Sequence, residues 1–155
     1  MALPIYKILP RGNLAPLADL WVASWQATLP AIDFAARRAW FSTYLCEIED
    51  RGGVTLCAYS DGGPLVGLIL VGFILLDPAQ KRLEQIAILP ATFGSGLGAF
   101  LLDHAKQIVG PGLSLEVNVD NPRALRFYEK RGFLRESQGV NPHSGLPIWH
   151  LSWPG

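Results

Sequence analysis

Hydrophobic residues in the first third of the chain recur every three or four positions, which is the period of a helix with one buried face. This spacing predicts a helix from near Asn13 to the Leu29-Pro30 pair, and a second helix over about 33–49. Charged residues flank the apolar stripe of the second segment, and Gly52-Gly53 ends it. Both helices are expected to bury one face.

Shorter apolar segments, bounded by turn residues, predict strands elsewhere in the chain. Strands are expected over residues 5–9, 54–59, 65–76, 83–89, 113–119, 133–136 and 148–153. The longest apolar run, Leu65 to Leu76, has 12 residues, which is too few to cross a bilayer as a helix. Because it follows a turn and contains β-branched residues and glycines, we interpret it as a buried strand.

Two more helices are predicted in the second half of the chain. One covers about 96–109, and the other runs from the Asn121-Pro122 pair to Gly132, with Asn as its cap and Pro at its first position. The predicted order is β-α-α-β-β-β-α-β-α-β-β. This order favours an α/β class fold of the α+β kind, with a mixed sheet, helices on both faces and a single domain over 1–155.

Composition narrows the possible functions. Of the 155 residues, 50% are hydrophobic and 17% charged, and 13 basic residues balance 13 acidic ones. Binding to nucleic acid or to an anionic membrane normally needs a basic excess, so we expect neither. Cys46 and Cys57 lie in apolar segments without metal-ligand spacing, and the N-terminus lacks a signal-peptide pattern. Two reduced thiols favour a cytoplasmic protein.

A glycine-rich turn after the strand over 83–89 is the clearest chemical feature. Phe93-Gly94-Ser95-Gly96-Leu97-Gly98 joins this strand to a predicted helix. Glycines allow close approach of a ligand to the backbone, and the N–H groups at a helix start attract an anion such as a diphosphate. A tight turn or close helix–sheet packing would use the same residues, so the turn alone leaves these alternatives open.

A second segment makes the pattern more specific. It runs from Leu115 to Phe133 and contains Asn121-Pro122-Arg123-Ala124-Leu125-Arg126-Phe127-Tyr128 followed by Gly132-Phe133. Together the two segments resemble the GNAT superfamily of acyl-CoA-dependent N-acetyltransferases. That family has Arg/Gln-x-x-Gly-x-Gly/Ala at the first segment and Asn-x-x-Ala-x-x-Phe-Tyr-x-x-x-Gly-Phe at the second. Phe93 departs from the first pattern, and we expect weaker cofactor binding from the lost side-chain contact.

The resemblance implies acetyl-CoA as cosubstrate and assigns roles by position. It implies cofactor contacts by Ile86, Ile88, Phe93, Gly94, Ser95, Gly96, Leu97, Gly98, Asn121 and Tyr128. Tyr128 is expected to protonate the leaving thiolate, and the Ile86 N–H to bind the carbonyl oxygen. Glu84 is the candidate base for the amine, and an alternating strand would place it on one face with Ile86 and Ile88. Asn121 is expected to cap its helix or to contact the cofactor.

The acceptor is left open as a primary amine of a small molecule, a protein N-terminus or a lysine. Trp21, Trp25, Trp40 and Phe41 are expected in the core, although some could line the acceptor pocket. His143 or His150 could border that pocket, and no metal-ligand spacing links them. The alternatives are an acyl-CoA sensor without turnover and a domain for another phosphate ligand or a protein partner. A homodimer through the final strand is also possible.

Overall fold

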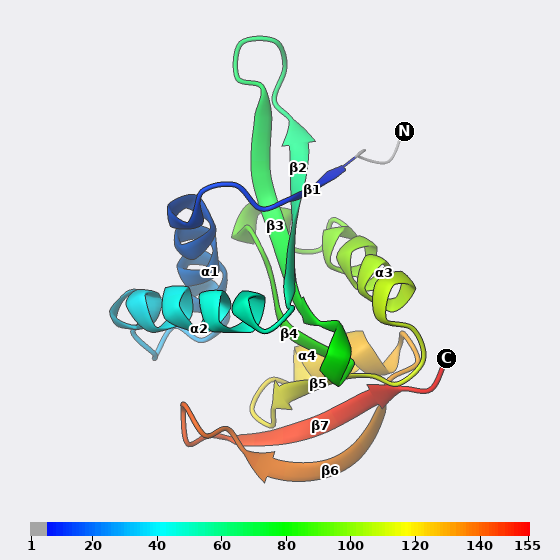
Figure 1. Ribbon diagram of the computed structural model, residues 1–155. Helices are drawn as coiled ribbons and strands as arrows, with labels where there is room; N and C mark the ends of the chain where they lie inside the picture. Colours follow the sequence, from blue (N-terminus) through cyan, green and yellow to red (C-terminus); the bar gives the residue numbers. More distant parts are fainter. Residues whose placement is uncertain (1–5) are drawn as a thin grey trace.

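The computed structural model describes residues 6–155, which form one twisted sheet with helices on both faces (Figure 1). The strands are β1 (Lys7–Pro10), β2 (Val54–Asp61), β3 (Leu68–Asp77), β4 (Arg82–Ile88), β5 (Leu113–Asn118), β6 (Leu134–Val140) and β7 (Pro147–Trp153). The helices are α1 (Leu14–Thr28), α2 (Arg38–Asp50), α3 (Leu97–Val109) and α4 (Pro122–Glu129), with 3₁₀ turns η1 (Ala35–Arg37), η2 (Pro78–Gln80) and η3 (Pro90–Thr92). The mixed sheet and the predicted element order are confirmed.

The sheet has the strand order β1-β2-β3-β4-β5-β7-β6, and only β4 and β5 are parallel neighbours. Each face has its own hydrophobic core. Helices α1 and α2 cover one core, which includes Trp21, Phe41 and Phe73. Helices α3 and α4 cover the other, which includes Leu101 and Phe133. Burial of these two apolar faces is the main force that holds the helices on the sheet.

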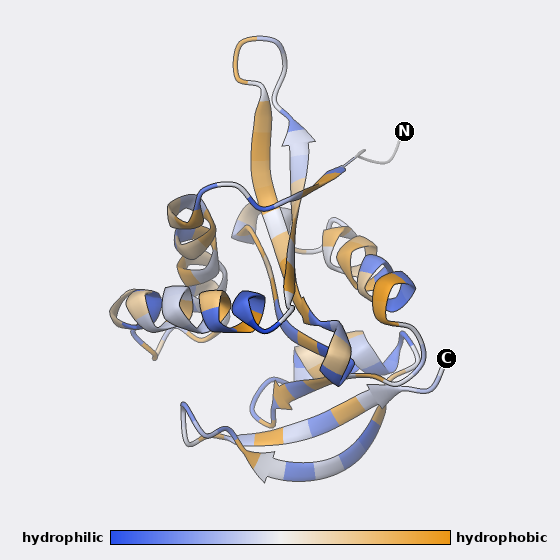
Figure 2. Ribbon diagram, in the orientation of Figure 1, coloured by the Kyte–Doolittle hydropathy of each residue, from blue (hydrophilic) through white to orange (hydrophobic). Residues whose placement is uncertain are grey.

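The long apolar run was only partly predicted correctly. Strand β3 begins at Leu68, and the three preceding residues form the tip of the β2–β3 hairpin, where Leu65 is 100% exposed. Gly67 makes this turn, because its carbonyl accepts from the Gly62 N–H (2.7 Å) and its own N–H donates to Gly63 (2.8 Å). Figure 2 shows hydrophobic colour continuing along β3 toward the hairpin that projects from the body. Hydropathy alone could not show where the sheet ends.

Three smaller differences concern element boundaries and edges. The second helix is preceded by η1, so α2 itself starts at Arg38. Phe133, which was expected to begin a strand, packs in the core before β6 begins. The first predicted strand starts at Ile5, which lies outside the described residues. Strand β7 lies between β5 and β6, so the expectation that the final strand pairs across a dimer interface is wrong. The edge strands of the sheet are β1 and β6.

Candidate active site

The site begins where β4 and β5 separate. These parallel strands pair only at Arg82 and Ser114, near their starts, and share no further paired residues. Ser114 donates its N–H to the Lys81 carbonyl (2.8 Å), which fixes the strands together at that end. Beyond this point the sheet is open between β4 and β5, so groups at their carboxyl ends can face a ligand.

A β-bulge in β4 changes the predicted direction of Glu84. Leu75 pairs with Gln85 and Leu76 pairs with Leu83, so Glu84 is the extra residue. Its side chain contacts Tyr44 of α2, whereas Ile86 and Ile88 pack against the core under α3. The expectation that Glu84 shares a face with these two isoleucines is therefore wrong. The bulge re-aims the carboxylate toward the α1–α2 side.

The backbone of β4 offers two N–H groups to the opening. The Leu89 N–H donates to the Val71 carbonyl (2.8 Å), and hydrogen-bonded pairs alternate with non-bonded pairs along an antiparallel ladder. Ile88 opposite Gly72 and Ile86 opposite Ile74 are therefore pairs of the non-bonded kind. Their N–H groups turn away from β3, toward the gap that β5 leaves. This geometry suits the expected role of the Ile86 N–H.

The glycine-rich turn opens α3 in a conformation that glycine allows. Gly94 and Gly96 have φ angles of 79° and 91°, in the left-handed region that side chains disfavour. No acceptor within residues 6–155 pairs with the N–H groups of Gly94, Gly96 and Gly98. Donors that converge at a helix N-terminus suit a diphosphate.

The other residues of this loop already use their backbone N–H groups within the turn. The Phe93 N–H donates to Pro90 (3.1 Å), and the Ser95 N–H donates to Thr92 (3.0 Å). The Leu97 N–H contacts the Ser95 Oγ at 3.3 Å. At this helix start, the backbone donors without a partner in the described part of the chain are thus those of Gly94, Gly96, Gly98 and Ala99. The Phe93 N–H is already paired within this turn, and the expected contact of Phe93 with the cofactor stays a prediction.

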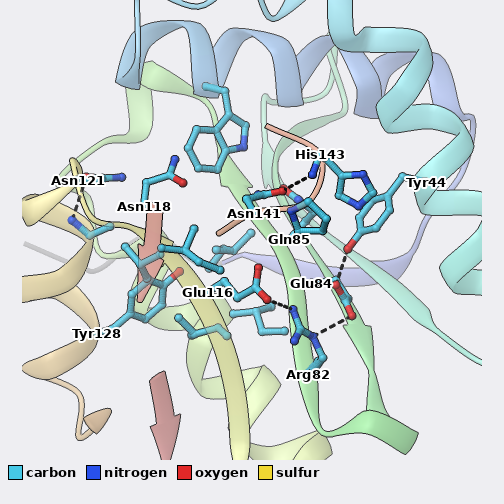
Figure 3. A pocket seen from close by; sticks show the side chains of 18 of the residues that line it. Tyr44, Arg82, Glu84, Gln85, Glu116, Asn118, Asn121, Tyr128, Asn141 and His143 are labelled. Atoms are coloured by element: carbon cyan, nitrogen blue, oxygen red, sulfur yellow. Dashed lines mark hydrogen bonds and ion pairs between the residues drawn. The ribbon is translucent and has the colours of Figure 1, made fainter. Parts of the chain in front are cut away.

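A cavity of about 750 Å³ extends from this opening across the sheet (Figure 3). It is lined by residues from α1, α2, β4, β5, α4 and the β6–β7 loop, among them Trp25, Tyr44, Glu84, Ile86, Glu116, Asn118, Asn121, Tyr128 and His143. Tyr128 lines one end of the cavity and is 8% exposed. Burial raises the pKa of its phenol, so the hydroxyl stays protonated at neutral pH.

Asn121 has the capping role that was one of its two expected functions. Its side-chain oxygen accepts from the Ala124 N–H at 3.2 Å, at the start of α4. This contact uses the oxygen and leaves the amide NH₂ group at the cavity wall. Capping fixes the direction of α4, and this helix presents Tyr128 to the cavity.

Charged side chains form the floor of the cavity. The Glu84 carboxylate, with its side chain 6% exposed, accepts from the Tyr44 hydroxyl and from Arg82 Nε at 3.1 Å. Arg82 also pairs with Glu116 at 3.1 Å, and His150 Nδ1 lies 3.7 Å from the same Glu116 oxygen. Burial, reinforced by the hydrogen bond to Glu84, raises the pKa of Tyr44. Two carboxylates therefore share one cavity with one bridging arginine.

Aromatic side chains and the β6–β7 loop border the other end. The ring centre of His143, from this loop, lies 5.0 Å from that of Trp40 and 5.9 Å from that of Tyr44. Trp25 and Trp40 line the cavity, whereas Trp21 and Phe41 stack in the core with ring centres 4.6 Å apart. The first two residues therefore line the pocket and the other two lie in the core, which are the two placements expected for these aromatic residues. His143 borders the cavity, as one of the two candidate histidines was expected to do.

Several cavity residues were not predicted. Tyr44, Arg82, Gln85, Glu116, Asn118 and Asn141 all line the cavity. Glu116 and Asn118 had a usable signal, because they alternate with the buried residues Leu115 and Val117 along β5. Tyr44 had none, since a tyrosine on an amphipathic helix is usually a packing residue.

Comparisons with known proteins agree with this geometry. Residues 14–133 match the sequence profile described as the acetyltransferase (GNAT) family, which is more than half of the chain. The chain belongs to the GNAT acetyltransferase family. Acetyl-CoA is the acetyl donor of GNAT acetyltransferases, as the sequence led us to expect.

Individual relatives support the assignment. This GNAT acetyltransferase is 31% identical to the peptidyl-lysine N-acetyltransferase YiaC of Escherichia coli over 156 aligned positions, covering 93% of this chain and 92% of YiaC. It is 40% identical over 86 residues to the peptidyl-lysine N-acetyltransferase YjaB of Salmonella typhimurium, and that match spans 54% of this chain and 57% of YjaB. The solved structure of apo YjaB from Escherichia coli superimposes with a TM-score of 0.73 at 24% identity, covering 97% and 99% of the two chains.

No helix among residues 6–155 is long and apolar enough to cross a membrane. Cys46 and Cys57 are both free, and burial raises the pKa of the Cys57 thiol to about 11. Cys57 is therefore an unreactive packed thiol, as predicted.

Proposed function

We propose that this GNAT acetyltransferase transfers the acetyl group of acetyl-CoA to the side-chain amine of a lysine in a peptide or protein. One observation carries the proposal. The cavity at the β4–β5 opening contains the two carboxylates of Glu84 and Glu116 and the buried Tyr128, and the chain belongs to a family whose acetyl donor is acetyl-CoA. The lysine acceptor is supported by YiaC and YjaB, which are both named peptidyl-lysine N-acetyltransferases.

Three groups of the chain would act on the reacting atoms. The Ile86 N–H would stabilise the acetyl carbonyl oxygen while it gains negative charge. The Glu84 carboxylate would receive the proton of the ammonium group, directly or through water, because lysine is protonated at neutral pH. The Tyr128 hydroxyl would give a proton to the thiolate that leaves. Glycine N–H groups at α3 would hold the diphosphate of acetyl-CoA.

An acyl-CoA sensor without turnover is not favoured, because the relatives are named as enzymes and the cavity contains candidate acid and base groups. The cytoplasmic location and the possible homodimer stay predictions. The first is motivated by two free cysteines, and sedimentation of the purified protein would decide the second.

The first test is ligand-dependent stability. Acetyl-CoA at about 100 times its dissociation constant should stabilise the protein by about 2.7 kcal/mol, which raises the unfolding midpoint by several degrees. An equal concentration of ATP is the control and should raise it less. No shift with acetyl-CoA would contradict the proposal.

The second test identifies the acceptor. Lysine peptides with a blocked N-terminus are incubated with acetyl-CoA, and mass spectrometry locates the acetyl group while a thiol reagent measures released CoA. The control peptide has arginine in place of lysine, which keeps the charge and removes the nucleophile. Acetylation of free small amines alone, with no modified lysine peptide, would refute the lysine assignment and leave acetyl transfer intact.

A further inference from the structure

The diphosphate site lacks a positive side chain of its own. Residues Phe93 to Gly98 contain no Lys, Arg or His. Three glycine N–H groups and the α3 dipole provide only partial positive charge, whereas each phosphate of a diphosphate carries a negative charge. A full counter-charge would have to come from a neighbouring element.

Helix α4 is that neighbour. A Cβ atom placed on Gly98 would lie 3.4 Å from Phe127 Cζ, so α4 packs closely against the first turn of α3. One helical turn earlier, the guanidinium carbon of Arg123 lies 5.6 Å from the centre of the Phe93 ring. Arg123 and Phe127 are four residues apart and therefore lie on the same side of α4, along the glycine-rich turn.

Arg123 differs from Arg131, the arginine that lies beside Phe127. Arg131 lies over Phe127 at 4.0 Å from the ring centre and donates to the Phe127 carbonyl at 2.9 Å, so its position is fixed by the helix end. Arg123 is exposed, and no carboxylate within residues 6–155 pairs with it. A guanidinium over an aromatic ring keeps its N–H groups free at the rim, where they can donate to an anion.

We propose that Arg123 supplies the cationic contact to the diphosphate of acetyl-CoA, with the Phe93 ring as the platform that directs it there. This inference rests on the proposed use of acetyl-CoA. It makes α4 a two-purpose helix, since Tyr128 faces the cavity while Arg123 faces the phosphate site. It also accounts for an apolar residue at the entrance of an anion site.

The test measures CoA affinity by calorimetry with the full chain. Arg123→Met keeps the apolar part of the side chain and should weaken CoA binding about tenfold, the effect of losing one charged hydrogen bond. Arg126→Met is the matched control, because Arg126 is also exposed on α4 and the cation–π contact with Phe93 is made by Arg123. It should change the affinity less than twofold. Equal losses in both variants would indicate a diffuse charge effect and overturn the proposal.

A second arm identifies the phosphate. Dephospho-CoA lacks the phosphate on the ribose but keeps the diphosphate. The Arg123→Met variant should lose affinity for CoA and for dephospho-CoA by the same factor. If its loss disappears with dephospho-CoA, Arg123 contacts the ribose phosphate and the diphosphate assignment is wrong.

A third arm moves the charge. Phe93→Arg in the Arg123→Met background should restore CoA affinity to within about threefold of wild type, because the guanidinium then extends from the turn itself. Absence of rescue in a variant with an unchanged unfolding midpoint would contradict a shared role of these two positions. Failure of wild type to bind CoA would instead refute the proposed function, so the two failures are distinguishable.

Discussion

The two regions that we propose bind the donor and the acceptor are built in different ways. At the start of α3, the proposed donor end consists of the backbone N–H groups between Gly94 and Ala99 that are unpaired within residues 6–155. In the cavity beside α1 and α2, the proposed acceptor end consists of side chains that come from separate segments, including Tyr44, Glu84 and His143. The first end depends on backbone conformation, and the second depends on which side chains the fold brings together.

This difference predicts opposite sensitivities. The donor end should tolerate side-chain substitutions that preserve the backbone φ and ψ angles. It should lose acetyl-CoA affinity when a glycine with positive φ is replaced by a residue that disfavours this angle. The acceptor end should respond to changes of single polar atoms. Tyr128 lines the cavity as the candidate general acid and should be the most sensitive position of all.

Tyr128→Phe removes the candidate acid and is expected to have the largest effect. Turnover should fall about 100-fold, within the usual range for general acid catalysis, while the dissociation constant of acetyl-CoA stays within twofold. Because burial raises the pKa of Tyr128 above its usual value near 10, wild-type turnover should not fall between pH 7 and about 10 from loss of this proton. Steady-state kinetics and calorimetry measure the two effects. A loss of affinity as large as the loss of turnover would assign Tyr128 to binding alone.

Glu84→Gln and Glu116→Gln compare the two carboxylates of the acceptor end. Glu84→Gln should lower turnover about 30-fold at pH 7.5, and less at pH 9.5, where more of the lysine amine is already neutral. Glu116→Gln should lower it less than threefold. The reverse order would transfer the base role to Glu116. Unfolding midpoints control for lost contacts with Arg82.

Gly96→Ala tests the donor end through its backbone. The φ angle of 91° disfavours alanine although a Cβ meets nothing within 4 Å, so strain of about 1 kcal/mol is expected. Acetyl-CoA affinity should fall about tenfold when the N–H groups move. Gly145→Ala, with φ of 73° and equally open space, is the control in the β6–β7 loop. It should cost similar stability and leave acetyl-CoA affinity unchanged, and an equal loss of affinity in both would refute a local role.

His143→Ala should have the smallest effect and only at the acceptor end. Removing the ring contacts with Trp40 and Tyr44 should raise the KM for a lysine peptide about threefold, because one aromatic contact contributes about 0.5–1.5 kcal/mol. The acetyl-CoA affinity should not change. A change in acetyl-CoA affinity without a change in peptide KM would contradict the division into two ends.

Most of the fold could be predicted because its elements follow local rules. Spacing and turn residues located α1, α3, α4 and most strands, and Asn121-Pro122 marked the start of α4 correctly. The boundary of β3 could not be predicted, because apolar residues 65–67 look the same in a strand and at an exposed hairpin tip. The bulge at Glu84 could not be predicted either, because it depends on the pairing of β4 with β3.

The proposed donor end could be recognised from the chain alone, since one continuous segment contains the glycines, the turn and the helix start that form it. The proposed acceptor end could not, because its residues come together only in the folded protein. The cavity joins Tyr44, Glu84, Glu116 and His143 from four separate elements, and their meeting depends on strand divergence, one bulge and the closure of the β6–β7 loop over α2. The difference lies in how far apart in the chain the interacting residues are. Backbone angles are set by neighbours in the chain, whereas side-chain contacts between distant segments exist only after the sheet has formed.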